Sequence, residues 1–229
     1  MKNIYQKMYH TNRQLGLKTN KRIEIMADII NSLKLNRANI LDIGCYDGTL
    51  LSLIKNKKNN LYGLDASDYA VEKCRRKKIK IKQFFLNGQE KIPFKSSFFD
   101  LIIVGEIIEH IYDTDFFLEE ISRLLKPNGY LLISTPNIAS LGRRLLLLLG
   151  ISPLIEISPN QKNSSGHIRY FTFQTLRKLL EEHKFSVLLK KSDVVNFNSC
   201  GSINSKILSQ TFPSLGQSII YLANLFVAH

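Results

Sequence analysis

The sequence predicts an α/β protein with a doubly wound, mostly parallel sheet of seven strands, folded as a single domain. Its 229 residues fit one domain of this class. Between residues 39 and 136, apolar segments of strand length alternate with amphipathic segments at helical spacing, the pattern of a parallel sheet with right-handed crossovers. Hydrophobic residues make up 44% and charged residues 22% of the chain. These shares exclude a mainly disordered chain and allow a sizeable core.

The expected elements of the amino-terminal half follow in chain order. Residues 1–20 are polar and aromatic, and we expect a flexible or lid-like arm there, followed by a helix over 21–34. The segment NILDIG (39–44) predicts a short buried strand that leads into a turn. The next elements expected are a helix over 49–57, a strand over 60–66, a helix over 68–78 capped by Ser67 or Asp68, and a strand over 79–86.

The second half begins with FDLIIVG (99–105), which is nearly all apolar, as a central parallel strand should be. Pro127-Asn128-Gly129 should stop a helix over 113–126, and YLLISTP predicts a strand over 130–136. Beyond residue 136 the alternation loosens. The remaining elements expected are an apolar helix within 138–155, a polar loop over 156–168, a helix over 172–183 capped by Thr172, a strand over 185–190, and a last strand or helix over 217–228.

The chain is strongly basic, with 32 Lys and Arg against 19 Asp and Glu, a formal net charge of +13. Such a surface favours acidic partners such as nucleic acid, anionic lipid or phosphorylated substrates. Lys, Asn and Ile are abundant throughout, however, so a coding bias is the favoured explanation of the excess. The three cysteines, Cys45, Cys74 and Cys200, form neither a disulfide framework nor a CxxC pair, which indicates a reducing cytoplasm. No secretory signal and no bilayer-spanning apolar run are expected.

A turn with two glycines follows the first strand, in the sequence Ile40-Leu-Asp-Ile-Gly-Cys-Tyr-Asp-Gly48. Gly44 and Gly48 allow the backbone to turn tightly and to approach a ligand closely. In an open α/β sheet, that ligand lies at the carboxyl ends of the strands. Asp65 ends the next strand, where an acid accepts hydrogen bonds from ribose hydroxyls. The spacing is GxxxG rather than the nicotinamide pattern GxGxxG, and Asp42 suits a cationic amino-acid group better than a pyrophosphate.

These residues resemble the class I S-adenosylmethionine-dependent methyltransferases. LDIGCYDG is similar to their glycine-rich first motif and GLDAS to their ribose-binding motif, and the likeness runs through residues 38–137 and, more weakly, 166–185. The resemblance implies a Rossmann-like methyltransferase fold that binds S-adenosylmethionine. The cofactor residues that it implies are Asp42, Gly44 and Gly48 along the methionine part, Cys45 through its backbone, Asp65 on the ribose, Ala66 and Asn87 near the adenine, and Glu106. Tyr46 replaces the usual middle glycine, and Asn87 stands where the family often has an acid.

The segment Glu106-Ile-Ile-Glu109-His110 follows the fourth strand. If it is helical, its two carboxylates and its imidazole share one face, and such a donor set suits a divalent cation of intermediate hardness. The ExxEH pattern is similar to that of ubiquinone-pathway O-methyltransferases and of small-RNA 3′-terminal 2′-O-methyltransferases. The resemblance implies a site for Mg, Mn or Zn made by Glu106, Glu109, His110 and His167. Without a metal, His110 and Glu109 are the candidate catalytic groups.

The most concrete function expected is O-methylation of a small-molecule, saccharide or lipid-linked acceptor, with or without a divalent metal. The alternatives are an RNA 2′-O-methyltransferase and a non-catalytic module that binds nucleic acid or membrane. Residues 140–155 combine two arginines with a leucine run, which predicts a lid helix, a dimer contact or a weak contact with the inner membrane surface. The expected parts are an N-terminal arm and helix over 1–37, a cofactor-binding core over 38–137, a substrate-cover insertion over 138–170, and the rest of the fold over 171–229.

Overall fold

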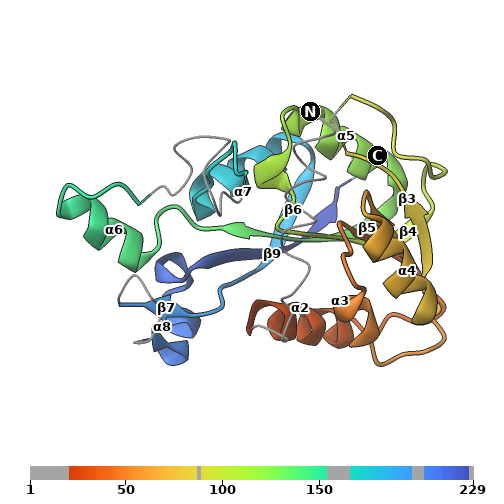
Figure 1. Cartoon of the computed structure of the whole chain (residues 1–229), viewed down its shortest axis with the longest axis horizontal. Helices are drawn as coiled ribbons and strands as arrows, with labels where there is room; N and C mark the ends of the chain where they lie inside the picture. The colour runs from red at the N-terminus through yellow and green to blue at the C-terminus, as the bar shows by residue number, and fades with distance from the viewer. Residues whose placement is uncertain (1–20, 87–88, 154–165, 198–203, 227–229) are drawn as a thin grey trace.

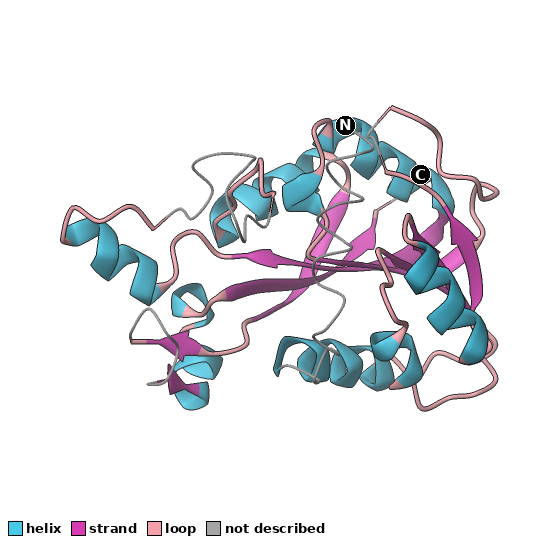
Figure 2. Ribbon diagram, viewed as in Figure 1, coloured by secondary structure: helices cyan, strands magenta, loops and turns pink. Residues whose placement is uncertain are grey.

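A seven-stranded sheet runs through the middle of the molecule in the computed structural model, which describes residues 21–86, 89–153, 166–197 and 204–226 (Figures 1 and 2). Its strand order is β3-β2-β1-β4-β5-β9-β6. The bounds are β1 Asn39–Ile43, β2 Asn60–Asp65, β3 Lys80–Gln83, β4 Phe99–Gly105, β5 Leu125–Pro136, β6 Phe185–Lys191 and β9 Ser218–Leu225. Only β9 runs antiparallel to its two neighbours, so the predicted fold class is confirmed.

The apolar runs of the central strands form the sheet because they are buried on both faces. Along β1 and β4 successive side chains face opposite sides, as the pleat requires. One face carries Ile40, Leu101 and Ile103, and the other carries Leu41, Ile102 and Val104. The first face is covered by α2 (Lys21–Ser32), α3 (Thr49–Ser52) and α4 (Asp68–Arg76). The second is covered by α5 (Thr114–Leu124) and α7 (Phe173–Glu182), so two cores enclose the sheet (Figure 1).

The carboxyl-terminal half adds elements outside these two layers. Helix α6 (Leu141–Leu148) extends away from the sheet and buries none of its residues (Figure 1). The short strands β7 (Val195–Asn196) and β8 (Asn204–Ser205) pair with each other, and α8 (Lys206–Thr211) and the 3₁₀ turn η2 (Pro213–Leu215) follow them. None of the helices in the described residues is long and apolar enough to cross a bilayer.

Two predicted helices end earlier in the structure than the sequence indicates. The helix expected to reach residue 57 ends at Ser52, because the Asn31 side chain binds both Leu53 O and Lys55 N just beyond it. The helix expected over 113–126 ends at Leu124, and β5 begins at once. The strand-pairing register then shifts around Asn128, whose φ of 60° is left-handed.

Other differences concern element ends and caps. The strand expected over 79–86 is confined to Lys80–Gln83, which pairs with β2 at the edge of the described sheet. The apolar helix expected within 138–155 is limited to Leu141–Leu148. The Ser67 side chain makes no capping bond, whereas Thr172 caps α7 as predicted, accepting from Thr175 N at 3.1 Å. The last segment is a strand rather than a helix. The expected arm over 1–20 and most of the expected loop over 156–168 lie outside the described residues.

Candidate active site

The glycine turn lies directly after β1, at the carboxyl edge of the sheet. Gly44 and Gly48 both have left-handed backbones, with φ of 75° and 71°. A side chain at Gly44 would overlap Ile107, and one at Gly48 would come within 2.5 Å of the Ile79 side chain. The Gly44 amide donates to Leu64 O at 2.7 Å, which ties the turn to β2. Both positions therefore require glycine for conformation and for space.

Tyr46 occupies the middle of the turn in a left-handed conformation, with φ of 46°. Such a conformation is uncommon for a bulky residue and is unfavourable unless its surroundings hold it. Its amide donates to Asp65 Oδ2 at 2.9 Å, and its ring lies 5.4 Å from that of Tyr69 between centroids. The Asp65 carboxylate therefore supports the shape of the turn as well as facing the carboxyl edge.

Two acids, Asp42 and Asp65, are each only 5% exposed at the ends of neighbouring strands. Asp65 also accepts from Ser67 N at 2.9 Å. Burial raises the pKa of Asp65 against the effect of its backbone hydrogen bonds. Burial, with Cys74 and Asp65 as acidic neighbours, raises the pKa of Asp42 well above its usual range. Neither acid forms an ion pair with any described basic side chain, so both can accept hydrogen bonds from a ligand.

Cys45 directs its side chain into the core, and only its backbone belongs to the turn. Its Sγ lies 3.7 Å from Cys74 Sγ, and it fills the space above Gly63, where an added Cβ would lie 2.7 Å from it. Ala66 follows Asp65 directly and accepts from Gln83 Nε2 at 3.1 Å through its carbonyl. Asn87 and Cys200 lie outside the described residues.

The segment after β4 does not form the α-helical face that would join Glu106, Glu109 and His110. Glu106 has a left-handed φ of 56°, which cannot continue a helix, and its amide donates to Ser134 O at 3.0 Å. A short 3₁₀ turn, η1, then covers Ile108–His110. The Glu106 carboxylate lies 3.0 Å from Arg22 Nη1 and accepts from Ser134 Oγ at 3.2 Å. It is therefore held by α2 and β5 rather than by the neighbouring residues of its own segment.

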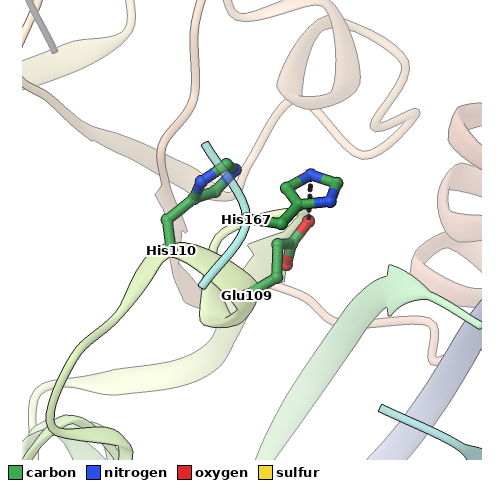
Figure 3. Close-up of side chains that lie close together, drawn as sticks. All are labelled: Glu109, His110 and His167. Atoms are coloured by element: carbon green, nitrogen blue, oxygen red, sulfur yellow. Dashed lines mark ion pairs between the residues drawn. The ribbon is translucent and has the colours of Figure 1, made fainter. Parts of the chain in front are cut away.

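Glu109, His110 and His167 form a compact cluster in which one ligand atom from each lies within 4.8 Å of the others (Figure 3). The Glu109 main-chain carbonyl accepts from the amides of Ile168 and Arg169, at 2.9 and 3.1 Å. Those two bonds bring His167 from a distant part of the chain to the turn. The rings of His110 and His167 are 4.9 Å apart between centroids, and His110 Nδ1 lies 3.1 Å from Gly166 O.

The Glu109 carboxylate is 1% exposed, and one of its two oxygens has no hydrogen-bond partner among the described residues. Oε2 accepts from Thr135 Oγ1 at 2.9 Å, while Oε1 has no hydrogen-bond partner and lies 3.9 Å from His167 Nε2. Burial and then the neighbouring Glu106 carboxylate raise the pKa of Glu109 to about 8. A buried acceptor without a donor is costly, so this oxygen suits a proton, a ligand or a cation. One carboxylate with two imidazoles also fits a transition-metal ion.

Sequence reasoning missed three residues of this site: Thr135, Ser134 and Arg22. Thr135 and Ser134 lie near the end of β5, which pairs with β4 in parallel, so their place at the carboxyl end of a predicted strand could have indicated them. Arg22 gives no such signal, because it is one basic residue on the polar side of an amphipathic helix.

Comparisons with known proteins identify the family of this chain. A family model described as "Methyltransferase domain" matches residues 18–190. A ubiquinone biosynthesis O-methyltransferase of Pelagibacter ubique is 32% identical over 167 residues, covering 72% of this chain and 67% of that protein. Its counterpart in Bartonella bacilliformis is 31% identical over 157 residues, covering 65% and 60%. The chain thus spans about two thirds or less of these relatives' length.

Solved structures show the same fold. The chain matches a 1,6-didemethyltoxoflavin-N1-methyltransferase of Burkholderia thailandensis, solved with S-adenosylhomocysteine, at a TM-score of 0.64 and 13% identity. That match covers 97% of this chain and 86% of the other. The family model covers well over half of the residues. The chain therefore belongs to the class I S-adenosylmethionine-dependent methyltransferase family.

Proposed function

We propose that this protein is an S-adenosylmethionine-dependent O-methyltransferase whose acceptor hydroxyl is activated at Glu109, His110 and His167. The observation that carries the proposal is the position of this cluster. It follows β4, which pairs with β1 in parallel, so both the cluster and the glycine turn lie at the carboxyl edge of neighbouring strands. The names of the ubiquinone biosynthesis relatives support transfer to an oxygen.

The proposed cofactor residues act by binding and orientation. Asp65 would accept from the ribose hydroxyls, Asp42 would face the cationic amino-acid end, and Gly44 and Gly48 would allow close approach. Contacts from the Cys45 backbone, Ala66, Asn87 and Glu106 complete the proposed set. The bound cofactor supplies an already activated methyl group, so the work left to the chain is to position the two reactants.

The cluster can activate an acceptor hydroxyl in two ways. Without metal, Glu109 or His110 accepts the hydroxyl proton, and a Glu109 pKa of about 8 is near the value that suits a general base at neutral pH. With metal, Glu109, His110 and His167 supply three donors, a set that favours Zn²⁺ or Mn²⁺ over Mg²⁺. Such an ion would lower the pKa of a bound hydroxyl. Glu106 could join this set only by leaving Arg22.

Two measurements on the same protein test the function, the acceptor class and the metal. Calorimetry should show binding of S-adenosylhomocysteine. Labelled cofactor should transfer its methyl group to a molecule in a cell extract, and the product should have the chemical stability of a methyl ether. Loss of transfer on chelation, with recovery on adding Zn²⁺ or Mn²⁺, would support the metal route, and full activity under chelation would eliminate it. Label in RNA would instead favour the RNA 2′-O-methyltransferase. Absence of cofactor binding would overturn the proposal.

We further propose that residues 138–170 cover the acceptor and that α6 contacts a membrane surface holding a lipid-linked acceptor. Leu147 and Leu148 at the end of α6 and Leu149 just after it are 65%, 82% and 73% exposed, and this helix leaves the body of the protein (Figure 1). Large apolar side chains gathered at one exposed site are unusual on a monomer. The formal net charge of +13 would add attraction to anionic lipid.

We expect binding to vesicles containing phosphatidylglycerol, and the double variant Leu148→Ser/Leu149→Ser should weaken it about tenfold or more, because each leucine contributes buried apolar area. Co-sedimentation measures the effect. Leu188→Ser is the matched control, since Leu188 is 54% exposed on β6, away from α6. Equal binding of the double variant and the wild type would remove α6 from the contact.

A further inference from the structure

A cavity lies between the base of α6, the start of α7 and the strands β6 and β9. It has a volume of about 520 Å³, a size typical of small-molecule pockets. Two of its lining residues connect it to the candidate active site. Asn137 lies two residues after Thr135, the partner of Glu109, and pairs in a β-bridge with Phe171, which precedes the lining residue Thr172. Two residues of extended chain span at most about 7 Å, so the two sites are close along β5.

The lining combines basic and apolar side chains. Arg144, Arg177 and Lys190 line the cavity, and among the described residues no acidic side chain does. Phe173 and Val187 supply apolar surface, and Lys190 Nζ lies 4.6 Å from the centroid of the Phe173 ring. Lys190 is therefore placed over the apolar part of the lining. A ligand complementary to this surface has an anionic end and an apolar or aromatic body.

The positive charge of the cavity is only partly neutralised. Neither Arg144 nor Lys190 forms an ion pair within the part of the chain that the structure describes. Arg144 donates instead to the carbonyls of Ala139 and Ser214, at 2.6 and 3.5 Å. Arg177 pairs with Glu181 at 2.7 Å, but both side chains are largely exposed, so solvent screens that pair.

The Tyr221 phenol, which also lines the cavity, does not offset the positive charge. Burial raises the pKa of the Tyr221 phenol to about 12, so this side chain stays neutral at ordinary pH. Its hydroxyl donates to Phe173 O at 2.8 Å.

We propose that this cavity binds an oxyanion, a phosphate or a carboxylate, carried by the methyl acceptor. The inference rests on the proposed methyltransferase function and narrows its acceptor to an anionic organic molecule. Arg144, Arg177 and Lys190 hold the oxyanion by charge-assisted hydrogen bonds, and Phe173 contacts the adjoining apolar part. The bound anion then fixes the acceptor at one end, while its hydroxyl lies toward Glu109 along β5.

Binding of simple probes to the full chain tests the proposal. Phenyl phosphate, benzoate and inorganic phosphate are titrated separately, followed by the amide NMR signals of Gln174 and Ser214, which line the cavity. We expect phenyl phosphate or benzoate to shift these signals, and the stronger of the two identifies the oxyanion. Inorganic phosphate should bind more weakly, because it has no apolar body to contact the apolar side chains of the lining. Lys190→Met should weaken the better probe about tenfold, the loss typical of one charge-assisted bond.

The controls separate this inference from the proposed function. Lys178→Met should bind the probe as the wild type does, because Lys178 follows Arg177 on α7 but does not line the cavity. Arg177→Gln, at an exposed position, gives a second test if Lys190→Met is poorly folded. Failure of both organic probes to bind would overturn the inference. So would binding of the better probe by Lys190→Met and Arg177→Gln with the same affinity as the wild type. Calorimetry with S-adenosylhomocysteine on the same samples tests the function independently, since none of these residues belongs to the cofactor site.

Discussion

Replacing Glu109 with glutamine should lower the rate of methyl transfer by about two orders of magnitude or more. Glutamine keeps the size of the buried side chain and can still accept from Thr135 Oγ1, so the fold should survive. It cannot take up the acceptor proton, and it is a poor ligand for a cation, so the metal route is lost and only His110 is left as a base. The single-turnover rate, measured with the acceptor fraction identified by labelling, checks this expectation.

The loss should appear in the chemical step and not in cofactor binding. The affinity for S-adenosylhomocysteine should stay near that of the wild type, because Glu109 contacts Thr135 and faces His167 rather than the glycine turn. Glu119→Gln is the matched control, as it changes an exposed glutamate on α5, close in sequence. A Glu109→Gln enzyme with wild-type single-turnover rate would exclude this residue from the reaction.

Replacing Asp65 with alanine should weaken S-adenosylhomocysteine binding by about a hundredfold. A buried carboxylate that accepts from two ribose hydroxyls makes two charge-assisted bonds, each worth roughly a factor of ten. The change also removes the acceptor for the Tyr46 amide, which supports the left-handed turn. Calorimetry measures the affinity, and circular dichroism shows whether the fold persists. Asp28→Ala, at an exposed position on α2, should bind as the wild type does.

The pH dependence of cofactor binding gives a second measure of the same residue. Burial raises the pKa of Asp65 in the free protein, so its carboxylate takes up a proton at a higher pH than an ordinary aspartate. Affinity should therefore begin to fall, as pH is lowered, above the range in which exposed aspartates titrate. A cofactor affinity that stays constant until exposed aspartates titrate would contradict the ribose assignment. Cofactor binding by Asp65→Ala equal to that of the wild type would also contradict it.

The strands of the sheet and the glycine turn could be predicted because the signal for each lies in a short stretch of sequence. The run from Asp42 to Gly48 is one turn, and its two glycines meet left-handed positions that few other residues tolerate. Asp65 follows from the same logic, since β1 and β2 are parallel neighbours with Asp42 opposite Gly63. Strand ends in such a sheet bring their residues to one edge.

The geometry after β4 could not be predicted from spacing. An i, i+3, i+4 face requires a helix from Glu106 onward, but the left-handed Glu106 directs its carboxylate to Arg22 and Ser134. The contact of His167 with the cluster depends on main-chain bonds to the Glu109 carbonyl, which no periodicity reveals. Only the resemblance to known methyltransferases pointed to His167.

The position of β9 has a consequence for how the chain is made. It lies between β5 and β6 and is hydrogen-bonded to both, although it follows them in the sequence. During translation, β6 therefore emerges with no neighbour in the sheet to pair with, and its edge stays open until the ribosome has delivered Ser218–Leu225. An unpaired strand edge in a nascent chain invites wrong pairing. The amino-terminal half can assemble earlier, so binding by a chaperone during synthesis matters most for the carboxyl-terminal half, which contains β6 and β9.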